Sequence, residues 1–299
     1  MAEYKDVISE EMIRSQAWKY YFLAMAWPLY LFVIPYVYVR FKLLSFVFML
    51  FPGVYLFTWL LCLMHECWHK YTPCIANEQF YDVFSYMLFT DPQLYRLVHG
   101  HHHSKVNTWE DTEFHPLGKI NNRYLQRAYN FLEIVLGIIF TFGIVMHILP
   151  KHPRYKAKYK QSTHTISILM WILFYGGVGF LSASVFNLDV YPVAISFLIS
   201  FWLGSFIIHQ AQLIEHGNVI VEGDYHERNM AARNLKNDTV FEKLFHFLTH
   251  GDTHEHVLHH TVVAVYSRPF PGKLPMPDDA VYISLKDHIG NLWGMVAKG

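Results

Sequence analysis

Five long apolar runs dominate the hydrophobic pattern of the chain. Only the tripeptide RFK separates the first run from the second, which predicts a tight turn between them. A helix that crosses a bilayer needs about 20 mostly apolar residues, and prolines inside it are tolerated as kinks. We therefore expect an integral membrane protein with candidate spanning segments at residues 20–39, 43–64, 129–149, 166–186 and 190–214.

The composition supports a membrane setting. The 299 residues are 53% hydrophobic and only 16% charged, whereas soluble domains average about 25% charged residues. Lys and Arg together number 24, as do Asp and Glu, so the net charge gives no reason to expect a nucleic-acid partner. The N-terminal stretch MAEYKDVISEEMIRSQAWKYY has no cleavable apolar core and favours mature cytosolic sequence. The three cysteines form neither a disulfide framework nor a paired CxxC motif.

Histidine is concentrated at the ends of the apolar runs. Residues 65–69 read HxxxH, residues 99–103 and 256–260 each read HxxHH, and one more histidine ends the motif LIEH after the last run. Side chains at positions i, i+3 and i+4 of a helix share one face, so each motif predicts imidazoles that point in one direction. The nine aligned residues are His65, His69, His99, His102, His103, His216, His256, His259 and His260.

The remaining histidines carry a weaker signal. His101 and His254 lie two residues off the shared faces, so we expect them to point elsewhere. His209 lies about two helical turns before His216 and could face the same site. We expect surface or interfacial positions for His115, His147, His152, His164, His226, His246, His250 and His288.

The histidine motifs constrain the topology. They form one site only if they share a side of the membrane, so the chain must cross an even number of times between them, yet three apolar runs lie there. The run 129–149 contains Glu133 and His147 and leads into the basic segment 151–160, and positive charge beside spans favours the cytoplasm. We predict that this run is an interfacial or re-entrant helix. Four spans in two hairpins remain, with the active site and both termini on the cytoplasmic face.

Nine imidazoles exceed the needs of one metal ion. A catalytic zinc takes three protein ligands and a water, so two metals with four or five imidazoles each fit the number better. Imidazole suits Fe, Zn, Cu and Ni, and the ligand type alone does not choose among them. Ligating histidines usually donate their other ring N–H to an acceptor. The candidate carboxylate acceptors are Glu66, Glu110, Asp111, Glu113, Glu215, Asp252 and Glu255.

Two other classes of protein compete with this interpretation. HECWH matches the HExxH signature of zinc metalloproteases, in which the glutamate is the general base. A protease would leave the other seven aligned histidines without a function. A histidine-rich metal transporter would place its ligands near the middle of the membrane, whereas these histidines lie at the ends of the runs.

The order of the three motifs resembles that of the membrane fatty-acid desaturase and hydroxylase superfamily. HECWH is similar to its first histidine box, HGHHHSKVNTWEDTEFHP to the second box with its acidic tail, and HEHVLHH to the third. The element LIEHGN is similar to the alkane-hydroxylase branch, whereas DTEFHP looks more like the acyl-desaturase branch. The segment HHTVVAVYSRPFPG departs from the usual desaturase ending of the third box.

The apolar runs and the histidine motifs predict an all-α membrane protein with one membrane-embedded domain over residues 1–299, built from about four transmembrane helices, interfacial helices and a cytoplasmic histidine-rich cap. The resemblance covers most of this chain, from the first span to His260. It implies a non-haem di-iron centre with two Fe²⁺ ions, held by the nine aligned histidines, that activates O2. Glu66, Asp111, Glu113, Glu215 and Glu255 would support the ligands. The implied substrate is an acyl chain or similar hydrocarbon, reached by a tunnel from the bilayer. A fatty-acid desaturase is the first expectation and an alkane or fatty-acid hydroxylase is the alternative.

The chemistry implied by the resemblance requires outside electrons. The chain offers no paired cysteine motif and no room for a haem domain, so we expect an external donor of the ferredoxin, rubredoxin or cytochrome b5 type. The basic segment 151–160 could dock an acidic carrier, but contact with lipid headgroups is the simpler expectation.

Overall fold

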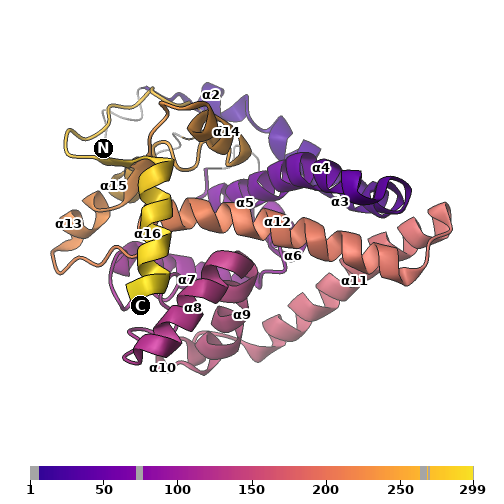
Figure 1. The fold of residues 1–299 in the computed structure, drawn as a ribbon, viewed down its shortest axis with the longest axis horizontal. Coiled ribbons are helices and arrows are strands. Elements are labelled where there is room, and N and C mark those ends of the chain that lie inside the picture. The colour runs from indigo at the N-terminus through magenta and orange to yellow at the C-terminus, as the bar shows by residue number, and fades with distance from the viewer. Residues whose placement is uncertain (1–6, 72–76, 263–267, 269, 299) are drawn as a thin grey trace.

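The computed structural model describes residues 7–71, 77–262, 268 and 270–298 (Figure 1). Residues 1–6, which begin the expected cytosolic N-terminus, and Cys74 lie outside this range, as does most of the segment just after the third histidine motif. The described chain is mostly helical, as expected. Its N-terminal half contains α2 (Glu10–Arg14), α3 (Trp18–Phe41), η1 (Lys42–Leu44), α4 (Ser45–Phe48), η2 (Met49–Gly53), α5 (Val54–Trp68), α6 (Asn77–Met87), α7 (Pro92–Lys105), α8 (Arg123–Leu136) and α9 (Ile138–Ile148).

The C-terminal half begins with two long helices and ends in shorter elements. These are η3 (Leu149–Lys151), α10 (Pro153–Lys156), α11 (Gln161–Phe186), α12 (Val190–His216), α13 (Tyr225–Met230), β1 (Arg233–Leu235), α14 (Val240–Leu248), α15 (His256–Thr261), β2 (Val281–Ile283) and α16 (Leu285–Lys298). In Figure 1, α3, α11 and α12 extend to one end of the molecule, whereas α13, α14, α15 and α16 gather toward the other. Strands β1 and β2 pair in parallel, with Arg233 opposite Val281.

Three helical segments of the described residues are long and apolar enough to cross a membrane. They are Glu10–Trp68 with 59 residues, Gln161–Phe186 with 26 and Val190–His216 with 27. The first contains two predicted runs, because the chain turns back after α3 at Lys42, whose φ is 49°. Helix α4, the π-helical η2 with Pro52 and α5 then follow one another as a single arm beside α3. Along α11, Ile172, Leu173 and Phe180 are 62%, 68% and 71% exposed. An apolar surface of this size fits lipid rather than water.

Small residues let α12 approach its neighbours closely. Ser196, Ser200, Gly204 and Ser205 are buried along one side of the helix. The Ser200 hydroxyl lies 2.9 Å from the Tyr30 hydroxyl of α3, and a Cβ on Gly204 would lie 2.5 Å from the Phe57 ring of α5. Small residues at helix contacts are typical of membrane bundles.

The run predicted as one interfacial or re-entrant helix is two helices. Gly137, with φ 65° and ψ −147°, separates α8 from α9. The apolar segment Ile138–Lys151 is too short to cross a bilayer. Helix α8 buries Asn130 and Glu133 and exposes an apolar face, with Tyr124 78% and Leu125 63% exposed. This arrangement suits a helix at the membrane interface.

We expect Gly137→Ala to lower the free energy of unfolding by about 3 kcal/mol, because its backbone conformation is almost restricted to glycine and the site is crowded. A Cβ at Gly137 would lie 2.5 Å from the carbonyl oxygen of Ser205. The Ser205 hydroxyl also accepts from Ile139 N and donates to Leu136 O across the break. Unfolding in detergent measures the loss. Gly143→Ala is the control, since no atom lies within 4 Å of its added Cβ, and equal stability of the two variants would contradict this expectation.

The short C-terminal elements are tied to the end of α12. Arg233 of β1 donates to the carbonyl oxygens of Ile214, Leu213 and Gly217 at 2.7, 2.9 and 2.6 Å. The neighbouring Asn234 accepts a hydrogen bond from Val257 N at the start of α15. These bonds hold the third histidine motif beside the end of α12.

Candidate metal centre

Five imidazoles form a first cluster, which we call cluster A. It brings together histidines from α5, α7 and α15 and from the residue that ends α5. The Nε2 atom of His65 lies 2.8 Å from that of His99 and 3.1 Å from that of His69. The Nε2 atoms of His103 and His99 are 3.1 Å apart. The members of cluster A are His65, His69, His99, His103 and His259.

Four further imidazoles form a second cluster, cluster B. The Nε2 atom of His216 lies 2.8 Å from that of His256 and 3.2 Å from that of His260. The ring of His102 completes the cluster, with its centroid 4.9 Å from the His216 ring and 5.0 Å from the His260 ring. The members of cluster B are His102, His216, His256 and His260. All nine aligned histidines of the sequence therefore lie in the two clusters.

Each HxxHH motif divides between the clusters, which differs from the single direction that the sequence predicted. On α7, His99 and His103 join cluster A while His102 joins cluster B. On α15, His259 joins cluster A while His256 and His260 join cluster B. Residues at i and i+4 stay together, and the residue at i+3 diverges enough to reach the neighbouring cluster.

Helix α7 owes its position to a buried cap. Asp91 precedes Pro92, its side chain accepts from Leu94 N at 2.9 Å, and its other oxygen accepts from the Tyr159 hydroxyl at 2.8 Å. An aspartate cap followed by proline at the first helical position is a strong start signal. The second histidine motif is thereby held on a fixed helix.

The outer nitrogens of four cluster histidines face hydrogen-bond acceptors. His99 Nδ1 lies 2.9 Å from Glu113 and His102 Nδ1 lies 2.8 Å from Asp111. His216 Nδ1 lies 3.0 Å from Asn107 Oδ1, and His256 Nδ1 lies 3.2 Å from Glu215. An outer N–H that donates to an acceptor leaves the lone pair of Nε2 facing the cluster, as metal ligation requires.

The other candidate acceptors have different partners. Glu66 accepts from the Tyr20 hydroxyl and pairs with Arg268, and Asp252 also pairs with Arg268. Glu110 pairs with Lys105, and Glu255 accepts from Gly272 N. Asn107 is an amide and was not among the predicted carboxylate acceptors, although it lies just after the second motif in the sequence.

Several histidines lie outside both clusters. His101 contacts Thr112, His254 packs beside His246, and His209 lies 3.4 Å from Glu133, so none of them joins the site. His288 is buried and contacts Gln210 at 3.1 Å, which corrects its predicted surface or interfacial position.

The donor set fits metal ions. Several Nε2 atoms converge at 2.8–3.3 Å, although a neutral imidazole has only one N–H and four of these rings direct theirs outward. The Nε2 atom of His259 is buried and has no hydrogen-bond partner in the described part of the chain. Burial and then the neighbouring histidines hold the pKa of His259 and of His260 well below its usual value, so both are neutral. Cations between the rings would satisfy these converging lone pairs.

Asp111 and His102 form a charge-assisted pair. Burial alone would lower the pKa of His102, but the charge and hydrogen bond of Asp111 outweigh it and raise that pKa. Burial would raise the pKa of Asp111, and the same contact outweighs it and lowers that pKa. The contact fixes the orientation of the His102 ring in cluster B.

We expect Asp111→Ala to weaken metal binding by about 10–100-fold, the usual cost of removing an acceptor behind a ligating histidine. Metal titration of the purified protein measures the change. The matched control is Glu110→Ala, because Glu110 is exposed and pairs with Lys105 instead. Equal affinities of the two variants would show that Asp111 does not support the site.

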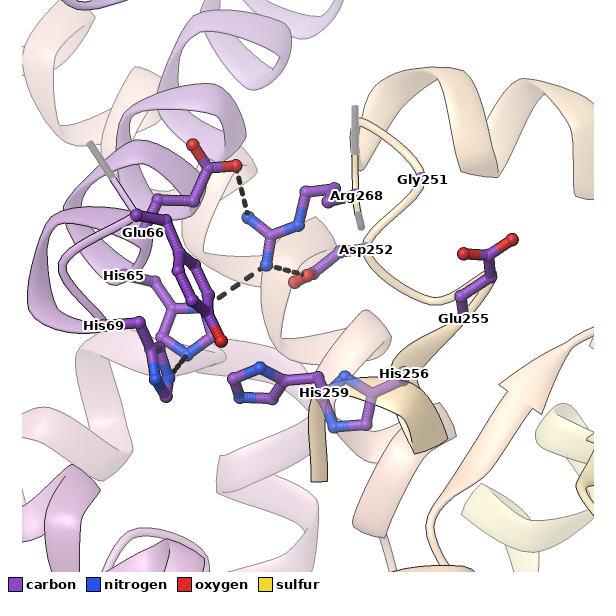
Figure 2. Close-up of a pocket in the computed structure, with 10 residues that line it drawn as sticks. His65, Glu66, His69, Gly251, Asp252, Glu255, His256, His259 and Arg268 are labelled. Atoms are coloured by element: carbon purple, nitrogen blue, oxygen red, sulfur yellow. Dashed lines mark hydrogen bonds and ion pairs between the residues drawn. The ribbon is translucent and has the colours of Figure 1, made fainter. Parts of the chain in front are cut away.

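Two cavities border the clusters. One, of about 40 Å³, lies between them, with Leu61, Cys62, Tyr95, Phe114 and Gln212 beside imidazoles of both; we call it the inner chamber. The other, of about 30 Å³, is the outer pocket of Figure 2, where Glu66, Asp252, Glu255 and Arg268 surround His65, His69, His256 and His259.

Comparison with known proteins gives a match to a protein family. The family model for fatty acid desaturases matches residues 41–268, which is more than half of the chain and includes all three histidine motifs. No curated protein matches the chain. The family model covers α5, α11, α12 and both clusters, and on this match the chain belongs to the fatty acid desaturase family.

Proposed function

We propose that this protein is an O2-dependent membrane oxidoreductase with two iron ions that removes hydrogen from an acyl chain, as a fatty-acid desaturase does. The observation that carries the proposal is the pair of imidazole clusters, one of five mostly buried rings and one of four buried rings, that border one chamber. Family membership supports oxidoreductase chemistry. We infer that cluster A and cluster B each hold one ion, with all nine imidazoles as ligands.

Bound iron would supply the oxidising power for an unactivated C–H bond, with electrons from a separate carrier. The side chains of the protein would hold the metal ions, orient the ligating imidazole rings and shield the centre from water. Glu113, Asp111 and Glu215 fix three of the imidazole rings, and Asn107 fixes a fourth. Leu61, Tyr95 and Phe114 provide the apolar and aromatic part of the chamber wall beside the clusters. Water exclusion protects a reactive centre from side reactions.

The inner chamber suits the reacting part of a substrate. Its volume of about 40 Å³ is larger than the space that one water needs. It is too small for a whole acyl chain. We infer that only the reacting segment of the chain enters the chamber, beside Leu61 and Phe114. The apolar surfaces of α3, α11 and α12 support a substrate that resides in the bilayer.

Hydroxylation is the alternative outcome at the same centre. The glutamate and histidine that end α12 favour it, because Glu215 orients His256 while His216 itself belongs to cluster B, and LIEHGN is similar to the alkane-hydroxylase branch. The two outcomes share the first hydrogen removal and differ only in the step after it. Product analysis separates them.

A zinc protease is less well supported than a desaturase or a hydroxylase. A protease would use Glu66 as the general base on a metal-bound water. Here the Glu66 carboxylate accepts from the Tyr20 hydroxyl at 2.9 Å and pairs with Arg268 at 3.6 Å. The other seven clustered histidines would also be unexplained.

For the topology we propose four crossings, by α3, by the α4–α5 arm, by α11 and by α12, with the clusters and both termini on the cytoplasmic face. Lys151, Lys156, Lys158 and Lys160 are exposed around η3 and α10, and exposed positive charge beside spans favours the cytoplasm. An external electron donor of the ferredoxin, rubredoxin or cytochrome b5 type would approach this face.

The proposal is tested by metal analysis of detergent-purified protein together with lipid profiling of cells that express it. We expect about two irons per chain and new double bonds that require O2. Hydroxylated lipids with the same iron content would select the alternative. One zinc per chain with no oxygen-dependent product would overturn the di-iron proposal and favour the protease.

A further inference from the structure

One cluster histidine has an outer nitrogen that faces a cation. Arg268 lies in the outer pocket, and Figure 2 shows its guanidinium directed at His65, with Glu66 and Asp252 on either side. Its Nη2 atom lies 3.2 Å from His65 Nδ1 and also pairs with Asp252, while Nη1 lies 3.6 Å from Glu66. The Arg268 side chain is 15% exposed, so these contacts are largely shielded from water.

This contact is opposite in kind to the four contacts between outer nitrogens and acceptors described above. His99, His102 and His256 face carboxylates, and His216 faces an amide oxygen. A guanidinium has donors only and stays charged in proteins, so His65 Nδ1 must accept from Arg268. A neutral imidazole that accepts at Nδ1 carries its proton on Nε2. The lone pair of His65 is then directed away from cluster A.

We propose that Arg268 competes with the metal of cluster A for His65, and that this makes cluster A the weaker and more readily emptied of the two metal positions. The inference rests on the proposed function, because it assumes that both clusters bind metal. Arg268 is a positioning residue in this scheme. It acts on the metal through the position of the His65 proton, because its guanidinium contacts the outer nitrogen of that ring.

Metal binding at cluster A must break the contact between Arg268 and His65. The proton of His65 moves from Nε2 to Nδ1, the lone pair of Nε2 turns to the metal, and no proton is gained or lost. Asp252 is the candidate acceptor for the new N–H at His65 Nδ1, because its carboxylate contacts the same Nη2 atom of Arg268 that contacts His65. Arg268 keeps Glu66 as a partner when it withdraws. Cluster B differs, since three of its four outer nitrogens, those of His102, His216 and His256, face acceptors. The fourth, that of His260, has no hydrogen-bond partner in the described part of the chain.

The test is titration of the metal-free protein in detergent with Co²⁺, whose absorption reports each bound ion. We expect two steps in the unsubstituted protein, with the second at least about tenfold weaker, the lower end of the range for groups behind ligating histidines. Arg268→Gln removes the obligate donor and offers an amide oxygen that can accept from His65 Nδ1, so it should strengthen the second step about tenfold. Arg268→Lys keeps a donor and should leave the second step weak.

A purely structural role for Arg268 predicts the opposite sign. If Arg268 only holds the third motif against α5, Arg268→Gln weakens the second step and Arg268→Lys preserves it, and that result overturns the proposal. The double variant with His65→Ala gives an independent check, because the gain from Arg268→Gln must disappear when His65 is absent. A gain in affinity that persists in the double variant also overturns the proposal. If the unsubstituted protein binds fewer than two Co²⁺ ions, the proposed two-metal function fails and this inference fails with it.

Discussion

Replacing His102 with alanine should empty cluster B and lower product formation by at least about 100-fold. Its ring is 2% exposed and lies against His216 and His260 in that cluster. The substitution removes one ligand from a set of four and leaves the buried Asp111 without its partner, and an unpaired buried carboxylate is itself costly. Iron per chain and lipid product per chain are the two measurements. We expect iron to fall from about two to about one.

The matched control for His102→Ala is the same substitution at the preceding histidine. His101 lies on the same helix but contacts Thr112 and belongs to neither cluster, so His101→Ala should keep both irons and most of the activity. The same comparison can be made on the third motif with His256→Ala and His254→Ala. Equal loss in both members of a pair would mean that the helix, and not the cluster, is the sensitive feature.

Filling the inner chamber should strongly reduce turnover while the metals stay in place. We expect Leu61→Trp to reduce product formation by about 100-fold, because displacing a substrate by about 1 Å is enough for a loss of that size. Leu61 lines the chamber but offers no metal ligand. Product formation and iron content are measured on the same preparation, and the iron content should remain near two per chain.

The conservative variant Leu61→Met is the control for the filled chamber. It keeps the side-chain volume and should cost less than about 1.5 kcal/mol of stability, with little loss of product. Full activity of Leu61→Trp would show that the substrate reaches the clusters by a path that does not involve the inner chamber.

The sequence predicted the nine clustered histidines because spacing on a helix is local information. Positions i and i+4 share a face wherever the helix lies, so His65 with His69 and His256 with His260 could be paired before any tertiary structure was known. The long apolar runs are also local information. They predicted α3, α11 and α12, and the predicted bounds differ from the observed helix ends by at most five residues. The division of each HxxHH motif between two clusters depends on how α7 and α15 meet, which spacing does not encode.

Contacts between distant segments account for the features that the sequence did not predict. Arg268 reaches His65 across 203 positions and Asn107 reaches His216 across 109, and no periodic pattern connects such pairs. The break at Gly137 was not predicted because a glycine inside an apolar run also fits a continuous helix. Only the close approach of Ser205 shows why the chain turns there.

Helix α7 links the positions of the two clusters, because it carries ligands of both. It carries His99 and His103 for one cluster and His102 for the other, and Asp91 anchors its start. A shift or rotation of this helix moves ligands of both sites together, so neither site can be reshaped alone by motion of α7. One residue inserted between His99 and His102 would turn the later ligands by about 100°. This stretch of the chain can therefore vary by substitution but not in length.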